Sequence, residues 1–223
     1  MNGNAVRVVL WGETVGYLTW DSSNWRTTTA VFSFAKDFLD KGLDISPLRM
    51  SIGSNLVQSR QSIRGTSPKE RFGGLHPVFA DSLPDHWGNS IFRKWAESHK
   101  ISMKNVTGVD LLSFIGKRAM GALEYEPSQE VININEKVDL DALTKLASEI
   151  LSEKEEFHIE KNDNLMAQLM ECGSSVGGAR AKTLIAWNPE TNDIRSGQID
   201  AGDGYEYWLL KFDNIKNNKD KDA

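Results

Sequence analysis

A glycine-rich segment in the C-terminal third of the chain could bind an anion. Residues 173–182 read GSSVGGARAK. Glycines let backbone N–H groups approach and surround an anion, and small hydroxyl side chains add donors. The segment matches neither the Walker A pattern nor the strict kinase G-x-G-x-x-G. A hairpin turn or a loop without a ligand has a similar composition, so the segment alone leaves both interpretations open.

A lysine in an otherwise apolar segment is the second candidate for anion binding. Lys211 lies in the run YWLLKF at residues 207–212, a predicted strand. In protein kinases, a strand lysine that follows the glycine-rich loop contacts the nucleotide phosphates. The alternative is a lysine on an edge strand that faces solvent. The order of loop, strand, connection and strand lysine matches a kinase ATP-binding lobe, and this order is more specific than either part.

The elements that would position these residues follow from the pattern of the sequence. β-branched and aromatic residues around a Gly-containing turn predict a hairpin over residues 5–20. Apolar residues at helical spacing predict helices, and Pro84 precedes the first of them. The further predicted strands are 28–34, 120–125, 183–187 and 207–212; the predicted helices are 85–100, 110–115, 165–170 and one from a cap at Asp139 or Asp141 to about residue 153.

Three stretches predict loops and connections rather than regular elements. Residues 46–77 are rich in Ser, Gly, Pro and Arg, which predicts loops with short strands. Residues 129–137 are polar and read as a connection between two parts of the chain. Residues 188–204 are polar and turn-rich, and they should join the last two predicted strands.

Composition indicates a folded protein without strong charge. The chain has 223 residues, 39% of them hydrophobic, with seven tryptophans and a net charge of −5. This length fits one large domain or two small ones, and the charge gives no general attraction to nucleic acid or anionic lipid. One cysteine, no signal-peptide pattern and no apolar run of about 20 residues predict a soluble cytoplasmic protein without membrane contact.

The remaining reactive residue types do not form a recognisable site. The four histidines lack the paired spacing of metal ligands, so we predict no metal site. Nothing pairs Cys172 with a plausible base. The basic residues of the segment 60–71 are interpreted as a solvated loop.

Two blocks of sequence carry a family signature. The first comprises FADSLPDHWG at residues 79–88 and DLLSFIGKRAMGAL at residues 110–123. The second is SVGGARAK at residues 175–182. The chain therefore resembles the HipA family of bacterial toxin–antitoxin kinases, whose signatures include DSLPD…G, dLL…iG…GAl and a loop S-[VL]-x-G-[AV]-x-x-K. The blocks occur in the family's order, and Lys211 extends the resemblance.

The resemblance implies an α+β fold in two parts and a role for each loop residue. Residues 1–127 would form the HipA-type N-terminal subdomain, a β-sheet with helices, and residues 128–223 a partial protein-kinase-like N-lobe. Lys211 would contact the α- and β-phosphates of ATP. Ser175 corresponds to a serine that family members autophosphorylate, which ejects the loop; a phosphate there adds about −2 charge beside the nucleotide. The loop residues that would lie over the ATP phosphates are Val176, Gly177, Gly178 and Ala179.

The resemblance also implies what this chain lacks. In the family, the catalytic aspartate and the Mg²⁺ ligands lie downstream on a helical lobe, and the sequence ends at Ala223 without an H-x-x-D-type catalytic loop. We therefore expect a truncated kinase, cut artificially or as a gene product, with no catalytic residue of its own. ATP and Mg²⁺ would serve the full-length enzyme, and nucleotide binding here should be weak at best.

Partners follow from the same resemblance. The full-length kinase would phosphorylate a cytosolic protein and pair with a helix-turn-helix antitoxin, with DNA reached only through that antitoxin. The rival interpretation is a stand-alone regulatory or antitoxin-like binding module that acts on a separate HipA-like kinase core. The sequence after residue 127 argues against the rival, because a pure regulator has no need of the glycine-rich segment or Lys211. An unrelated glycine-loop hydrolase would need a Ser–His–Asp or carboxylate pair, and none can be placed.

Overall fold

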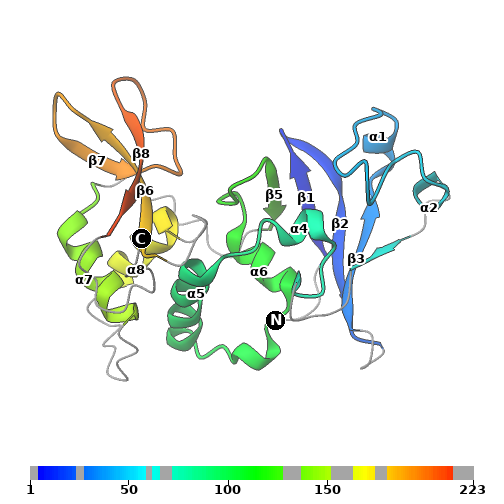
Figure 1. Ribbon diagram of the computed structural model, residues 1–223, viewed down its shortest axis with the longest axis horizontal. Helices are drawn as coiled ribbons and strands as arrows, with labels where there is room; N and C mark the ends of the chain where they lie inside the picture. The colour runs from blue at the N-terminus through cyan, green and yellow to red at the C-terminus, as the bar shows by residue number, and fades with distance from the viewer. Residues whose placement is uncertain are drawn as a thin grey trace. The chain divides into compact units, whose positions relative to one another are not determined.

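The computed structural model folds the chain into two compact units (Figure 1). The N-terminal unit comprises Met1–Leu83 and Val106–Glu130, and the C-terminal unit comprises Pro84–Asn105 and Val131–Ala223. The structure describes residues 5–23, 28–58, 62–65, 72–127, 137–151, 163–173 and 180–212.

A five-stranded antiparallel sheet organises the N-terminal unit. Its strand order is β4-β3-β2-β1-β5. The predicted hairpin and the two following strands are confirmed. The hairpin turn consists of Trp11 and Gly12, both with positive φ (52° and 81°), which is the backbone of a type I′ turn. The strands are β1 Val6–Leu10, β2 Glu13–Asp21, β3 Thr29–Phe34, β4 Ile63–Arg64 and β5 Leu123–Glu126.

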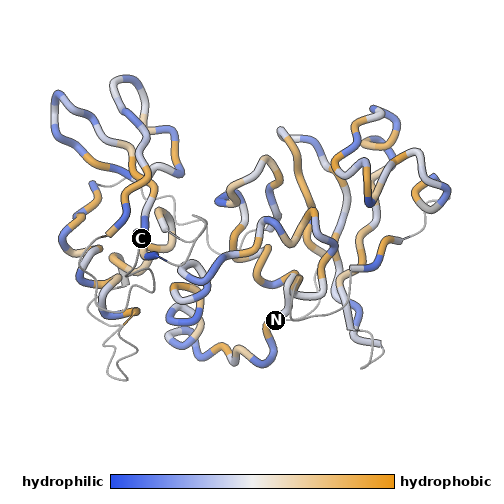
Figure 2. The backbone as a smooth tube through the Cα atoms, in the orientation of Figure 1, coloured by the Kyte–Doolittle hydropathy of each residue, from blue (hydrophilic) through white to orange (hydrophobic). Residues whose placement is uncertain are grey.

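Short helices cover the core of this unit. Phe79 of α4 is fully buried, and its ring centroid lies 4.7 Å from that of Phe32 on β3. Thr107 and Asp110 form a capping box that starts α6. In Figure 2 the strands and α6 carry many hydrophobic residues. The helices are α1 Lys36–Leu39, α2 Asn55–Gln58, α4 Pro77–Ala80 and α6 Gly108–Ile115.

Three helices and a three-stranded antiparallel sheet form the described part of the C-terminal unit. Helix α5 contacts α7 and α8, and α8 contacts β6 and β7. The sheet order is β7-β6-β8. Asp139 caps α7, since its Oδ1 accepts a hydrogen bond from Ala142 N at 3.0 Å. The elements are α5 His86–Ser98, a short 3₁₀ helix Met103–Asn105, α7 Leu140–Leu151, α8 Asp163–Gly173, β6 Lys182–Asn188, β7 Asp193–Ser196 and β8 Glu206–Lys211.

Two sequence expectations differ from this architecture. The stretch 188–204 was expected to be only a connection, whereas it contains β7, which pairs with β6 from Ile185 to Asn188. The sequence division at residue 127 stays a prediction, and the compact units follow another arrangement, because α5 groups with the residues that follow 130. The α+β class is confirmed. Among the described helices, none combines the length and hydrophobicity that a membrane crossing requires.

Candidate functional site

The glycine-rich loop predicted to bind ATP lies outside the described residues. This applies to Ser175, Val176, Gly177, Gly178 and Ala179. The structure does describe the two residues at the margins of the motif, Gly173 at the end of α8 and Lys182 at the start of β6, and it describes Lys211. The geometry of the site is therefore built from β6, β8 and the helix ends.

Lys211 ends β8, which has β6 as its neighbour in the sheet among the described strands. Its side chain is exposed. Exposure on an edge strand agrees with the solvent-facing alternative, and it also leaves the ammonium group accessible to a ligand. The role predicted for Lys211 stays a prediction.

Lys182 lies directly opposite Lys211 across the antiparallel β6–β8 pair. Phe212 N donates to Ala181 O at 3.0 Å, so the two lysines form a non-hydrogen-bonded pair. In such a pair the side chains share one face and lie closest together. Lys182 is buried, at 4% exposure. The register therefore places both lysine side chains on one face of the sheet.

An apolar pair continues the same face of the sheet. Residues two apart in a strand point to the same side, so Leu184 and Leu209, which are also register partners, follow the two lysines. Leu184 is half-buried and Leu209 is 49% exposed. Tyr207 comes next, and its hydroxyl accepts from Ala201 N at 3.1 Å. The face therefore places two cations beside an accessible apolar surface.

Trp87 of α5 holds the start of β6. Its side chain is fully buried, and Nε1 donates to Lys182 O at 2.8 Å. The next carbonyl along the same edge, Leu184 O, accepts from Gly197 N at 2.9 Å just after β7 ends. The indole thus supplies a donor beyond the end of β7.

The comparisons with known proteins concern the first half of the chain. The family model described as the HipA N-terminal domain matches residues 6–126. This span contains the five-stranded sheet and α5, with the DSLPDHWG sequence that leads to Trp87. The chain belongs to the HipA family. No curated protein matches it.

Membership of the HipA family indicates a toxin–antitoxin context. The match confirms the resemblance to the N-terminal portion of a HipA protein. It ends before β6 and β8, so it carries no information on Lys182 or Lys211.

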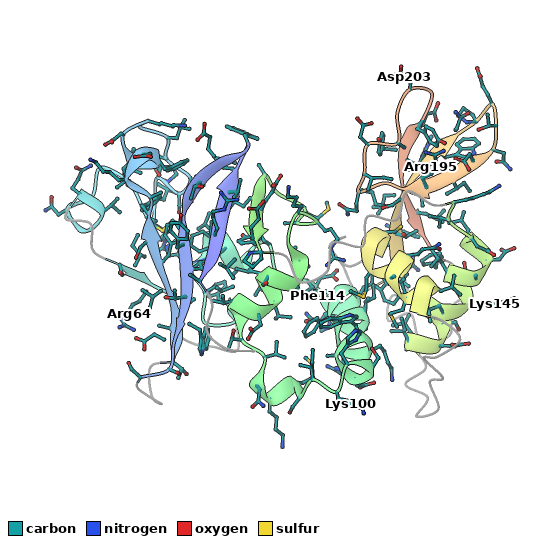
Figure 3. The ribbon with its side chains drawn as sticks, turned by 180° about the vertical axis from the view of Figure 1, so that it is seen from behind. Arg64, Lys100, Phe114, Lys145, Arg195 and Asp203 are labelled. Carbon is teal, nitrogen blue, oxygen red and sulfur yellow. The ribbon has the colours of Figure 1, made fainter. Side chains whose placement is uncertain are left out.

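A third cation on this face of the sheet is Arg195 of β7 (Figure 3). It lies opposite Ala186, and its Nε donates to Asp193 Oδ2 at 2.8 Å. Tyr205 donates its hydroxyl proton to the same carboxylate oxygen. The hydrogen bond from Tyr205, followed by that from Arg195, lowers the pKa of Asp193. Arg195 therefore interacts with Asp193 and Tyr205, and we do not assign it to ligand binding.

Sequence reasoning missed one concave feature of the N-terminal unit. A hollow of about 360 Å³ is lined by eleven residues, among them Trp11, Leu43, Asp44, Val78 and Asp81. The tryptophan beside Gly12 is the sequence signal that could have indicated it, and in the structure Trp11 is 76% exposed. None of the predicted site residues lines this hollow. Within the described ranges, no group of three or more His, Cys, Asp or Glu side chains could hold a metal ion.

Proposed function

We propose that this chain is the ATP-binding N-terminal part of a HipA-like serine/threonine kinase. The observation that carries the proposal is the cross-strand pair Lys182 and Lys211 beside the apolar pair Leu184 and Leu209. This arrangement matches a nucleotide, which has anionic phosphates at one end and a flat apolar base at the other. The lysines would contact phosphates, and the leucines would contact the base.

In this proposal, the contacts with the phosphates contribute most of the binding free energy. A lysine ammonium bound to phosphate makes a charge-assisted hydrogen bond, which is stronger than a neutral one. A polyphosphate could contact Lys182 and Lys211 together, because the register places them opposite one another. We propose that Val176, Gly177, Gly178 and Ala179 add backbone donors from the glycine-rich segment.

Ser175 would regulate this site in the proposed kinase. It lies one residue before the proposed phosphate-binding loop. Phosphorylation would add about −2 charge, which repels the phosphates of ATP and disfavours the bound loop. The full-length kinase would phosphorylate a cytosolic protein and bind a helix-turn-helix antitoxin. Mg²⁺ would accompany ATP, and we assign it no ligand among the described residues.

Calorimetric titration with MgATP tests the proposal. Replacing Lys211 by methionine keeps the apolar stem and removes the charge, so we expect about tenfold weaker binding from the loss of a charged hydrogen bond. The matched control is Lys145→Met on α7, an exposed lysine of the same unit (Figure 3) that should leave affinity unchanged. Equal affinity of the Lys211 variant and the unmodified chain would exclude the proposed phosphate contact.

The extent of the family match favours a second candidate function. The match is confined to residues 6–126, the N-terminal domain, which is the part a regulatory module would need. Under this alternative the chain binds a separately encoded HipA-like kinase core. Co-purification with such a core, together with no MgATP binding by the chain itself, would favour the alternative over ATP binding.

A further inference from the structure

We infer that Trp87 is a positioning residue for the phosphate-binding end of β6. The inference rests on the proposed function for its link to ATP, whereas its structural part stands on described contacts. Trp87 belongs to α5, which precedes β6 by more than eighty residues in sequence. Both lie in the C-terminal unit.

The hydrogen bond from Trp87 fixes a backbone atom of a proposed ligand-binding residue. The indole N–H donates to Lys182 O at 2.8 Å in a fully buried position. A buried carbonyl oxygen that loses its donor has been removed from water without gaining a hydrogen bond, which destabilises the folded state. The start of β6 is therefore held where the indole can reach it.

The β7 strand cannot supply this support. On the same edge of β6, Gly197 N donates to Leu184 O at 2.9 Å, and β7 itself ends at Ser196. Lys182 O lies two residues earlier on that edge, where Trp87 provides the donor. On one edge, Lys182 accepts a hydrogen bond from Trp87 of α5. On the other edge, it lies opposite Lys211 of β8.

Gly173, which precedes the glycine-rich loop, has no Cβ in the space next to the same indole. A Cβ atom at Gly173 would lie 3.2 Å from Lys182 O and 3.4 Å from Trp87 Nε1. Glycine permits this close approach. Gly173 and Lys182 flank the segment 174–181, so Trp87 bonds one flanking residue and lies close to the space above the other. A change at the indole should alter their separation and the place of the Lys182 ammonium relative to Lys211.

Local sequence fixes Trp87 in the first turn of α5. Asp85 is the N-cap, and its Oδ1 accepts from Gly88 N at 2.9 Å. Asn89 Nδ2 donates to Pro84 O at 2.7 Å, which holds the preceding backbone against the helix. The hydrogen bonds within the PDHWGN sequence therefore fix the start of α5, and with it the position of Trp87. None of these bonds involves the glycine-rich segment.

The test replaces Trp87 by phenylalanine and, in a second variant, by 3-benzothienylalanine, which keeps the bicyclic shape without the N–H group. We expect amide hydrogen exchange at residues 182–184 to accelerate about tenfold, because a buried acceptor loses its donor. We expect MgATP affinity to fall by a similar factor, while exchange in α7 stays unchanged. Trp95→Phe is the matched control on the same helix, where the ring contacts Phe92 and His99.

Each outcome decides one part of the inference. Unchanged exchange at 182–184 in the benzothienyl variant would overturn the positioning role, as would equal acceleration in the Trp95 control. Faster exchange with unchanged MgATP affinity would overturn the link to the phosphates. If the unmodified chain binds no MgATP but the benzothienyl variant still loosens residues 182–184 selectively, the proposed function fails and the structural role of Trp87 stands.

Discussion

The core of the N-terminal sheet and strand β8 of the C-terminal unit differ in how far they expose large apolar side chains. In the N-terminal unit, Phe32, Phe79 and Tyr125 are all at most 1% exposed within a single core. In the C-terminal unit, the edge strand β8 exposes about half of Tyr207, Trp208 and Leu209. A sheet that buries its apolar side chains is stabilised by them, whereas exposed apolar side chains beside cations remain available to a ligand or partner. From this contrast we expect substitutions in the N-terminal core to cost more stability than substitutions in β8.

Replacing a core aromatic residue should produce the largest effect. Phe79→Ala removes a fully buried ring that packs against Phe32, so we expect a loss of about 3–5 kcal/mol in the free energy of unfolding. Trp208→Ala in β8, at 52% exposure, should change it by about 0.5 kcal/mol or less. Denaturant unfolding of the two variants measures the difference. Comparable losses would show that the exposed strand carries as much stability as the core.

Sequence patterns predicted most elements because the elements carry local signals. The hairpin was predicted with its turn at Gly12-Glu13-Thr14, and the structure places the turn one residue earlier, at Trp11 and Gly12. Of the two caps predicted for α7, Asp139 and Asp141, Asp139 accepts the capping hydrogen bond. Strand β7 was missed because its sequence, DIRS, has one apolar residue and no alternation. It forms because β6 offers an unpaired edge, which is information held elsewhere in the chain.

Of the candidate site, only the residues with a local signal could be predicted from the sequence. Lys211 was identified from an apolar strand that contains a cation, which is a local feature. The register that places Lys182 opposite Lys211 depends on how the connection 188–204 folds, and no local pattern determines it. The bond between Trp87 and Lys182 O joins residues 95 apart in sequence, so only the tertiary structure reveals it.

A pair of tyrosines tests the contrast with smaller changes. Tyr125 is buried in the N-terminal unit and donates to Ser82 Oγ at 2.8 Å, and burial raises its pKa above the usual range. Tyr125→Phe leaves Ser82 without this donor, so we expect a loss of about 1 kcal/mol. Tyr207→Phe in β8 removes an exposed hydroxyl, whose bonds water can replace, and should cost less than about 0.5 kcal/mol. Chemical denaturation checks both values, and the opposite ranking would contradict the contrast.

Surface carboxylates provide the smallest and most local test. In the N-terminal unit, hydrogen bonds from Ser23 and then from Arg64, whose Nη1 lies 2.7 Å from Asp21 Oδ2, lower the pKa of Asp21 from 3.8 to about 2. A depressed pKa means that the carboxylate favours the folded state above pH 3.8 and that this contribution disappears as the pH falls through about 2. Carboxyl-carbon NMR titration should find this midpoint, and Ser23→Ala should move it back toward 3.8.

The corresponding carboxylate of the C-terminal unit depends on a different neighbour. Asp193 also has a lowered pKa, but its largest cause is the hydrogen bond from Tyr205. Tyr205→Phe should therefore raise the pKa of Asp193 and leave that of Asp21 unchanged, while Ser23→Ala should do the reverse. Arg195 shares Asp193 with Tyr205 and lies over the Tyr205 ring. Phenylalanine keeps the ring under Arg195 and leaves the bond from Arg195 to Asp193, so MgATP affinity should stay unchanged; a changed affinity would contradict our exclusion of Arg195 from the ligand face.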